Sequence, residues 1–475
     1  MLRLGKEGLY QMHLIPNNLI KGAIAIVIWT FIVFIPSLGN NFVNYDDWKY
    51  VTENPYIHGL TLENLEKKAQ DDTNDGSIFP LPMLSFAAEY HFIKFDPRAY
   101  HVDNLELHLI NALLVYILIY LLSNSAGIAF LTAMLFAINP LRVESVAWIA
   151  ERKDLLYAFF YLGSLIMYVY AVKEKAFNGA CLACSCALFI FSLLSKPQAI
   201  TLPFVILAID LLYRRPRRRS VLIEKAPFLM ITMAYFYFLL GPRISHVSLT
   251  DPRIGNSIEK IFLSCNAVLI YILKNFIPFH LSCLYPFPHK VNGHFSLMVY
   301  GAPMMVLGVG YLLLKFFREN RFVIFGALFF IINIAIPLRL IWYNWFIGEH
   351  YMYLPSIGLC FAFSTVIVPV LKQSKPDVCQ IGKFLLALYI MCLSVMTFQY
   401  CHVWKDDITL WSYAIKKNPN DLRTAFAYWY RGLAYEKRGN HTKALEDYDK
   451  AIMIYPDFAE AHASQSEVFH RMRRN

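Results

Sequence analysis

Charged residues are scarce in this chain. Only 16% of its 475 residues are Asp, Glu, Lys or Arg, whereas 57% are hydrophobic. In a soluble globular domain roughly a quarter of the residues are charged, so this composition excludes a soluble globular protein. Repeated apolar runs of about 20 residues, each long enough to cross a bilayer, instead predict a polytopic membrane protein.

Patterns that would indicate a metal site, nucleic-acid binding or a secretory signal are also lacking. The nine cysteines lie mostly within apolar runs, where they are typical of packing residues. The net charge of +10 comes from basic residues clustered in short loops between these runs. This is the positive-inside pattern, so we expect no nucleic-acid partner. The first apolar run lacks a small-residue cleavage site, and we expect it to stay as a membrane anchor.

The apolar runs predict about eleven transmembrane helices. They fall at residues 19–37, 104–122, 126–137, 155–172, 178–195, 198–213, 225–241, 296–316, 321–338, 350–371 and 383–400. The stretch 258–277 would place the basic loop 315–321 outside if it crossed, so we expect it to lie in the interface or to re-enter. The N-terminus is then cytoplasmic and the C-terminus extracytoplasmic. Leu60 to Ala69 has the spacing of an amphipathic surface helix.

A second domain begins after the last apolar run. The spacing there matches a tetratricopeptide repeat at Tyr428, Gly432, Tyr435, Ala444, Tyr448, Ala451 and Pro456. We expect a membrane domain at 1–402, with residues 38–102 as its first large extracytoplasmic loop, and a repeat domain at 403–475. Roughly one and a half repeats plus a polar cap are too few for a long solenoid. Such a unit is expected to dock on the membrane domain or to contact a protein partner.

Two adjacent acids, Asp46 and Asp47, follow the first apolar run directly. Tyr45 and Trp48 flank them, and these aromatic residues favour the membrane–water boundary. Carboxylates held together at that depth repel each other and lose hydration, which raises a pKa or attracts a cation. The pair is therefore a candidate for a general base or an ion site, with an ordinary solvated loop as the alternative.

A polar stripe marks the start of the second predicted span. His101, Asn104, His108 and Asn111 lie at i, i+3, i+7 and i+10, within one arc of a helix. Lipid would leave these groups unpaired, so the stripe must face the bundle interior or a water-filled cavity. Both hydrogen bonding between helices and the lining of a substrate pocket fit this pattern.

The segment between residues 140 and 154 confines acids and bases between two spans on the same outer side. Glu144 lies there with the basic residues Arg142, Arg152 and Lys153 around an apolar centre. Such a concentration of charge favours a site for an anionic ligand at least as much as an exposed loop.

Two further outer positions, Lys196 and His350, carry groups suited to a phosphate. A single lysine between two spans is costly unless Lys196 snorkels or pairs with a phosphate. His350 either donates to a phosphate or caps the start of a helix. Carboxylates for a base, cations for a phosphate leaving group and a polar cavity, all on one side, together fit transfer from a lipid-phosphate donor.

An ordered set of stretches resembles the transmembrane and tetratricopeptide-repeat (TMTC-like) protein family. The stretches are residues 42–48, 100–111, 143–156, 195–197, 353–358 and 403–406. That family is related to protein O-mannosyltransferases and to the GT-C glycosyltransferases. The resemblance implies an all-α, GT-C-like membrane fold with a small C-terminal tetratricopeptide-repeat domain.

The resemblance also implies an activity: inverting transfer of a sugar such as mannose from a polyprenyl-phosphate donor to an acceptor hydroxyl at the extracytoplasmic face. Asp46 or Asp47 would then be the base, and the other would orient the acceptor or hold a divalent cation, a choice that stays open. The acceptor or sugar pocket would be shaped by Glu144, His101, Asn104 and His108, and the lipid phosphate steadied by Lys196, Arg152 and His350. Relatives usually have Arg where this chain has His350, which implies a weaker or pH-dependent phosphate contact.

Two alternatives remain at this point. The first is a non-enzymatic membrane scaffold that recruits partners through its repeats. The second is a flippase for lipid-linked sugars, which would require acids or bases in mid-span, and these are scarce. The sequence leaves open whether the acceptor is a protein, a glycan or a lipid. The short repeat array favours a bacterial inner membrane over the endoplasmic reticulum.

Overall fold

The computed structural model describes residues 17–59, 79–173, 177–215, 219–240, 257–288, 290–291, 293–338, 347–419 and 421–474. Over these residues the regular structure is helical, with one isolated bridge between Val291 and His294. The expectation of an all-α protein is therefore confirmed. The predicted surface helix at Leu60–Ala69 lies outside the described residues.

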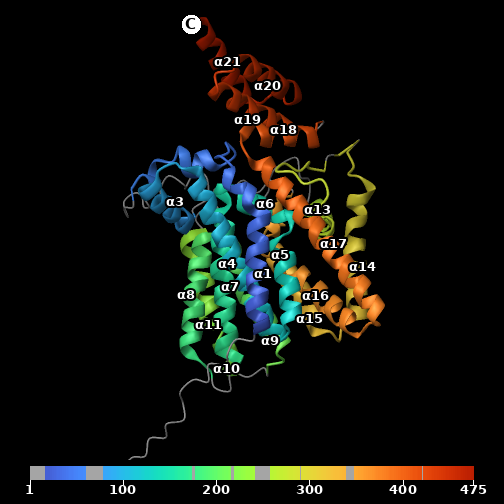
Figure 1. Ribbon diagram of the computed structural model, residues 1–475. Helices are drawn as coiled ribbons and strands as arrows, with labels where there is room; N and C mark the ends of the chain where they lie inside the picture. The colour runs from blue at the N-terminus through green and yellow to red at the C-terminus, as the bar shows by residue number, and fades with distance from the viewer. Residues whose placement is uncertain are drawn as a thin grey trace, which may run out of the picture.

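Long apolar helices form a bundle, with shorter elements at its two ends (Figure 1). In chain order its α-helices are α1 (Asn17–Phe34), α3 (Pro80–Ile93), α4 (Pro97–Ser123), α5 (Ala126–Ala137), α6 (Val143–Ala147), α7 (Arg152–Lys173), α8 (Gly179–Ser195), α9 (Leu202–Leu212), α10 (Arg219–Ile223), α11 (Ala226–Tyr235), α13 (Ser257–Phe276), α14 (Leu297–Phe317), α15 (Arg321–Ile334), α16 (Ser356–Gln373) and α17 (Pro376–Cys401). Helix α4 packs against α1, α5 and α7, so its polar stripe lies within the bundle.

Seven helices in the described residues are long and apolar enough to cross a membrane, or eight if the bent pair Ala126–Ala137 and Pro140–Ala147 is one span. Three more apolar helices, at Gly179–Ser195, Pro197–Leu212 and Arg321–Ile334, are shorter. The chain is thus a multi-pass membrane protein, and the predicted count of about eleven is not confirmed. The pair is bent by 59° where Pro140, which has no N–H for the helix ladder, follows Asn139.

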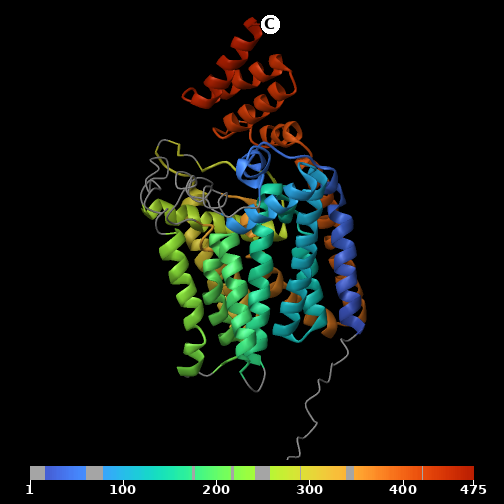
Figure 2. The same ribbon diagram turned by 90° about the vertical axis from the view of Figure 1, so that its left-hand side faces the viewer.

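Helix α13 differs in direction from the spans around it. Figure 2 shows it running across the bundle near the end that carries the C-terminal helices, whereas its neighbours run along the bundle. It is also absent from the candidate spans found among the described residues. Both observations agree with the expectation that residues 258–277 lie in the interface and do not cross.

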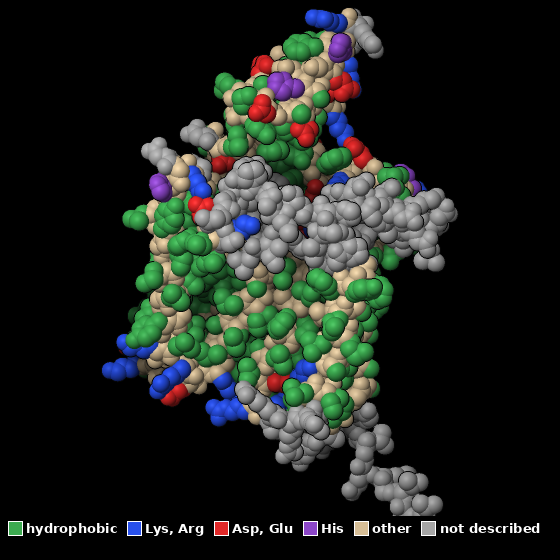
Figure 3. All heavy atoms as spheres, turned by 180° about the vertical axis from the view of Figure 1, so that it is seen from behind, with side chains coloured by type: hydrophobic (Ala, Val, Ile, Leu, Met, Phe, Trp, Pro, Cys, Tyr) green, Lys and Arg blue, Asp and Glu red, His purple; other side chains and the backbone are tan. Residues whose placement is uncertain are grey.

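Charge is distributed unevenly along the bundle. In Figure 3 apolar side chains cover its middle, and Lys and Arg gather at the end away from the C-terminal helices. Lys173, Lys315 and Lys372 occupy the last turns of α7, α14 and α16. By the positive-inside rule this basic end is the cytoplasmic candidate.

The C-terminal helices stack as antiparallel pairs beyond the opposite end of the bundle. They are α18 (Asp407–Lys417), α19 (Thr424–Lys437), α20 (His441–Ile454) and α21 (Ala459–Arg474). A Cβ atom at Gly432 would lie 2.5 Å from the Tyr448 ring, so glycine is required where α19 meets α20. Arg431, which stands where the repeat usually has Leu, forms a bidentate ion pair with Asp447 at 2.8 and 2.7 Å. The chain passes from α17 through a short turn at His402–Trp404, and the predicted domain boundary at 402/403 stays a prediction.

Candidate functional site

The two adjacent aspartates have different surroundings. Asp47 is 1% exposed, and its carboxylate oxygens accept hydrogen bonds from the backbone N–H groups of Val43 at 2.9 Å and Ala150 at 2.8 Å. Burial raises the pKa of Asp47 to about 7, although both hydrogen bonds oppose this rise. Asp47 therefore ties its own loop to the turn at Ile149–Glu151.

Asp46 is half-buried, and no hydrogen bond to its carboxylate is found within the described residues. Burial raises the pKa of Asp46, the charge of Lys153 opposes this rise, and the charge of Glu151 adds to it. The carboxylate of Asp46 thus lies within electrostatic range of the charges at the start of α7. Of the two aspartates, Asp46 has the carboxylate free to take a proton.

Aromatic packing fixes the loop that carries Asp46. The ring of Tyr45 stacks on Trp148, with centroids 4.5 Å apart and planes at 5°. Trp148 in turn stacks on Trp404 at 5.6 Å. Because these rings come from three distant parts of the chain, they hold the loop, the turn after α6 and the end of α17 in one arrangement.

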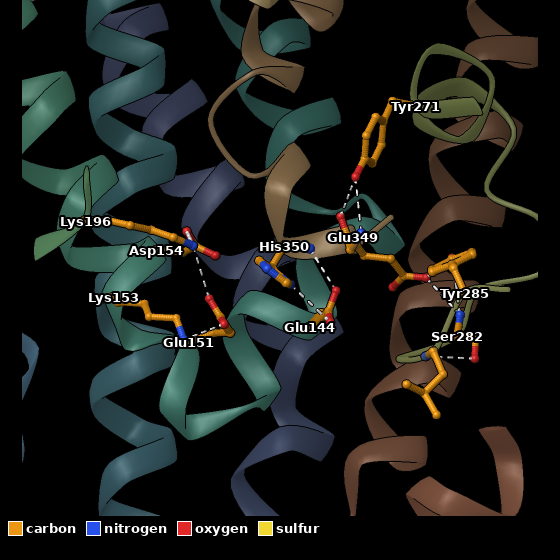
Figure 4. Close-up of polar contacts among 12 residues, drawn as sticks. Glu144, Glu151, Lys153, Asp154, Lys196, Tyr271, Ser282, Tyr285, Glu349 and His350 are labelled. Atoms are coloured by element: carbon orange, nitrogen blue, oxygen red, sulfur yellow. Dashed lines mark hydrogen bonds and ion pairs between the residues drawn. The ribbon is translucent and has the colours of Figure 1, made fainter. Parts of the chain in front are cut away.

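Two lysines and two carboxylates form a buried cluster beside this loop (Figure 4). Lys196 is paired with Asp154 and lies 3.4 Å from Glu151, and Lys153 lies 2.9 Å from the other oxygen of Glu151. The cluster joins the turn before α7, the first turn of α7 and the residue after α8. Its charges balance, which a buried ionic group requires.

His350 lies between this cluster and Glu144, as Figure 4 shows. One oxygen of Glu144 accepts a hydrogen bond from the backbone N–H of His350 at 2.8 Å, and the other lies 3.2 Å from its Nδ1. Burial by itself lowers the pKa of His350, but the carboxylates of Glu151 and Glu144 outweigh burial, and the pKa is raised. Glu144 therefore holds His350 in place and favours its charged form.

The polar stripe on α4 makes hydrogen bonds within the bundle. Asn104 donates to the backbone carbonyls of Val146 at 3.3 Å and Trp148 at 3.4 Å. His108 bonds through its two ring nitrogens to the Tyr353 hydroxyl at 2.7 Å and the carbonyl of residue 137 at 2.9 Å. His101 is buried on the same helix. These contacts of Asn104 and His108 agree with the expected hydrogen bonding between helices. That the stripe also lines a substrate pocket stays a prediction.

Arg152 is directed away from the lysine cluster. Its Nη1 is paired with Glu89, its Nε donates to Asn104 at 2.8 Å, and its Nη2 donates to the carbonyl of Tyr100 at 2.9 Å. All three guanidinium nitrogens thus have partners inside the protein. The predicted contact of Arg152 with a phosphate would require breaking at least one of these bonds.

The sequence analysis did not single out four buried acids near the site, and Glu349 is one of them. The others are Glu89, Glu151 and Asp154. One oxygen of Glu349 accepts hydrogen bonds from the Tyr285 hydroxyl and from the backbone N–H of Ser282, the latter at 2.9 Å. Burial, with a contribution from the charge of Glu144, raises the pKa of Glu349 to about 8. The one signal in the sequence is its place next to His350, and no periodicity identifies it.

A cation held by the aspartate pair does not fit this geometry. Both oxygens of Asp47 already accept backbone hydrogen bonds, which leaves Asp46 alone as a ligand. The described residues also hold no group of three or more His, Cys, Asp or Glu side chains arranged for a metal ion.

These features define a multi-pass helical membrane protein with a docked tetratricopeptide repeat and a charged site at one end of the bundle. The tetratricopeptide-repeat family matches residues 425–458. The Caenorhabditis elegans protein O-mannosyl-transferase F38B6.6 is 24% identical over 92% of this chain and 63% of its own length. Human protein O-mannosyl-transferase TMTC3 is 21% identical over 96% of this chain and 53% of its own length. The resemblance to the TMTC family is confirmed. The chain spans between just over half and just under two thirds of the length of these relatives.

Two solved structures are similar over most of the chain. ArnT from Cupriavidus metallidurans, bound to undecaprenyl phosphate, aligns with a TM-score of 0.45 at 14% identity over 96% of this chain and 79% of ArnT. The Archaeoglobus fulgidus oligosaccharyltransferase, tethered to an acceptor peptide, aligns with a TM-score of 0.40 at 13% identity over 90% and 58% of the two chains.

Proposed function

We propose that this protein is a membrane glycosyltransferase that transfers a sugar from a polyprenyl-phosphate donor to an acceptor hydroxyl, with inversion at the sugar carbon. The relatives described above are named protein O-mannosyl-transferases, so mannose is the proposed sugar and a protein the proposed acceptor. The scaffold and flippase alternatives have no such support.

The observation that carries this proposal is the placement of Asp46. Its carboxylate lacks a hydrogen-bond partner in the described chain and lies within range of the positive charges of Lys153 and His350. Lys196 and Lys153 both contact Glu151, so Lys196 is a third cation beside Lys153 and His350. A free base beside a group of cations is what transfer from a phosphate donor requires.

The proposed step is a single displacement. The acceptor oxygen forms a bond to the sugar C1 while the bond from C1 to the donor phosphate oxygen breaks. The hydroxyl proton passes to Asp46, and the polyprenyl phosphate leaves with the bonding electron pair. Lys153, Lys196 and His350 stabilise its negative charge. Each is paired with a carboxylate in the structure, so this requires them to exchange a carboxylate contact for one to the phosphate. Glu144 is the residue that positions His350. Attack opposite to the leaving group inverts the configuration at C1.

We place the reaction at the extracytoplasmic face. Helix α6, which carries Glu144, and the C-terminal helices lie at the end of the bundle away from its basic loops (Figures 1 and 3). The positive-inside rule assigns basic loops to the cytoplasm. The N-terminus would then be cytoplasmic and the repeat extracytoplasmic. The relatives described above are animal proteins, so the preference for a bacterial inner membrane has no support from them.

The test is transfer of radiolabelled mannose from polyprenyl-phosphate mannose by the purified protein in detergent. We compare the native chain with Asp46→Asn and, as a matched control on the exposed surface of the repeat, Asp457→Asn. The proposal predicts transfer by the native chain and the control, and its loss in Asp46→Asn. Transfer that survives Asp46→Asn would remove the proposed base. A native chain inactive with every donor would favour the scaffold or the flippase.

A further inference from the structure

A groove separates the first extracytoplasmic loop from the repeat. Its volume is about 450 Å³, within the range of sites that hold a drug-sized ligand. One wall comes from the loop, with Asn44, Trp48 and Glu53, and the other comes from α19, with Trp429, Tyr430 and Leu433. Neither the sequence patterns nor the proposed chemistry uses this groove.

Hydrogen bonds hold the two walls together. Asn44 donates through its side-chain amide to the carbonyl of Tyr430 at 2.8 Å and through its backbone N–H to Asp407 at 2.6 Å. Its side-chain oxygen accepts from the Trp411 indole at 2.6 Å. Since Asn44, Asp407 and Tyr430 line the groove, these contacts fix its shape before any ligand binds, and preformed sites lose less entropy on binding.

The groove lies next to the proposed base. Asn44 and Trp48, which line it, stand two residues before and after Asp46 in the chain. Tyr430 on the opposite wall is close enough that, after burial, the charge of Asp46 contributes to its raised pKa. Asp46 does not itself line the groove, so a bound segment must extend its hydroxyl beyond the groove wall to reach the carboxylate.

The position and lining of the groove indicate which substrate it holds. The donor's polyprenyl chain keeps it in the bilayer, whereas the groove lies between the first loop and α19. Figure 1 shows α19 beyond the end of the bundle. The acceptor therefore remains as its occupant. Four of the twelve lining residues carry aromatic rings, and the side-chain polar atoms of Asn44 are already paired, while Thr52, Glu53, Asp407 and Lys437 add further polar groups to the walls. Aromatic rings with a few polar groups between them fit an extended polypeptide that carries both apolar and polar side chains.

We propose that the groove between the first loop and α19 binds an extended segment of the acceptor polypeptide and presents its Ser or Thr hydroxyl to Asp46. This inference rests on the proposed function, since it assigns the second substrate of that reaction. Trp48, which is 40% exposed, is the main contact on the loop wall.

The first experiment detects binding without transfer. A benzoyl-phenylalanine photo-crosslinker replaces the exposed groove residue Lys437 or, as a control, Met453, which is 77% exposed on α20 outside the groove. A Ser/Thr-containing peptide should crosslink from position 437 and not from 453, and unlabelled peptide should compete. Equal crosslinking from both positions, or competition by an oligosaccharide and not by peptide, would overturn the inference.

The second experiment separates the two substrates by kinetics. Trp48→Ala should raise the acceptor KM about tenfold, the effect expected for truncating an interface aromatic, and leave the donor KM unchanged. Phe469→Ala, on the exposed surface of α21, is the matched control and should change neither constant. An unchanged acceptor KM in Trp48→Ala would contradict the inference. A native chain that crosslinks the peptide but transfers no sugar would refute the proposed function and leave the groove assignment standing.

Discussion

The indole Nε1 of Trp411 donates a hydrogen bond to the side-chain oxygen of Asn44 across 2.6 Å. Trp411 lies on α18, and Asn44 lies two residues before the proposed base. The remaining amide group of Asn44 is bonded to α19. The repeat is therefore part of the structure that positions Asp46, and not a separate appendage.

This contact predicts a positioning role for Trp411. Trp411→Phe keeps the ring but removes the donor to Asn44, so the Asp46 loop should lose its fixed position and kcat should fall about 10- to 100-fold. The donor KM should stay unchanged. Tyr448→Phe removes a hydrogen bond to Glu436 within the repeat, away from the loop, and is the control. Equal kcat values for the two variants would contradict the role.

The two aspartates should respond differently to the same substitution. Asp46→Asn should lower transfer by at least about 100-fold, the usual contribution of a general base, without changing the thermal unfolding temperature. Asp47→Asn should destabilise the protein by about 1–3 kcal/mol, because an amide NH₂ then faces a buried N–H donor of Val43 or Ala150. Thermal unfolding in detergent measures the stability of both variants, and the transfer assay measures their activity. The same unfolding temperature for the two variants would argue against this division.

The pH profile of transfer should be bell-shaped. The pKa of Asp46 is raised, so activity should fall on the acid side at a pH above the ordinary aspartate range, as the base becomes protonated. The pKa of His350 is also raised, so activity should fall on the alkaline side above the ordinary histidine range, as the imidazolium loses its charge. Arginine stays charged, so His350→Arg should remove the alkaline limb and keep the acid limb. Persistence of the alkaline limb in this variant would assign it to another group.

Glu349 should make the protein less stable as pH rises. Burial raises its pKa in the folded protein to about 8, so between its unfolded pKa, near 4.5, and 8 the folded state binds more protons than the unfolded state. Stability therefore decreases across this window. Glu349→Gln should flatten the decline in unfolding temperature between pH 5 and pH 8. An identical slope for the variant would show that Glu349 is charged in the folded protein.

Arg152 should act through folding more than through phosphate binding. Arg152→Met leaves Glu89 without its partner in a buried site, which should cost about 3–5 kcal/mol. Arg152→Met combined with Glu89→Gln should recover much of that loss, with the donor KM unchanged. A stable single variant with a raised donor KM would instead support the phosphate contact predicted from the sequence.

The length of the apolar runs and the spacing of a few residues in the sequence were enough to predict the architecture. Apolar runs at membrane length predicted helices, since backbone groups in lipid must be satisfied within the segment. The spacing of Gly432 and Tyr448 predicted the repeat, because small and large residues must alternate where paired helices touch. The position of the acid pair after α1 could also be read from the sequence. The number of membrane crossings could not be predicted, because helices such as α8 and α15 are shorter than the apolar runs that predicted them.

The roles within the site depended on contacts between residues far apart in the chain. Asp46 and Asp47 are equivalent by composition, and they differ in the folded protein by burial and by the hydrogen bonds that Asp47 accepts from the backbone N–H groups of Val43 and Ala150. The sequence predicted a phosphate contact for Arg152, yet in the folded protein Arg152 is paired with Glu89. Composition and periodicity thus determined that the chain forms a helical membrane bundle with a repeat and an acid pair at its edge. The tertiary structure decided which carboxylate stays available, because burial and hydrogen bonding depend on residues that only folding brings together.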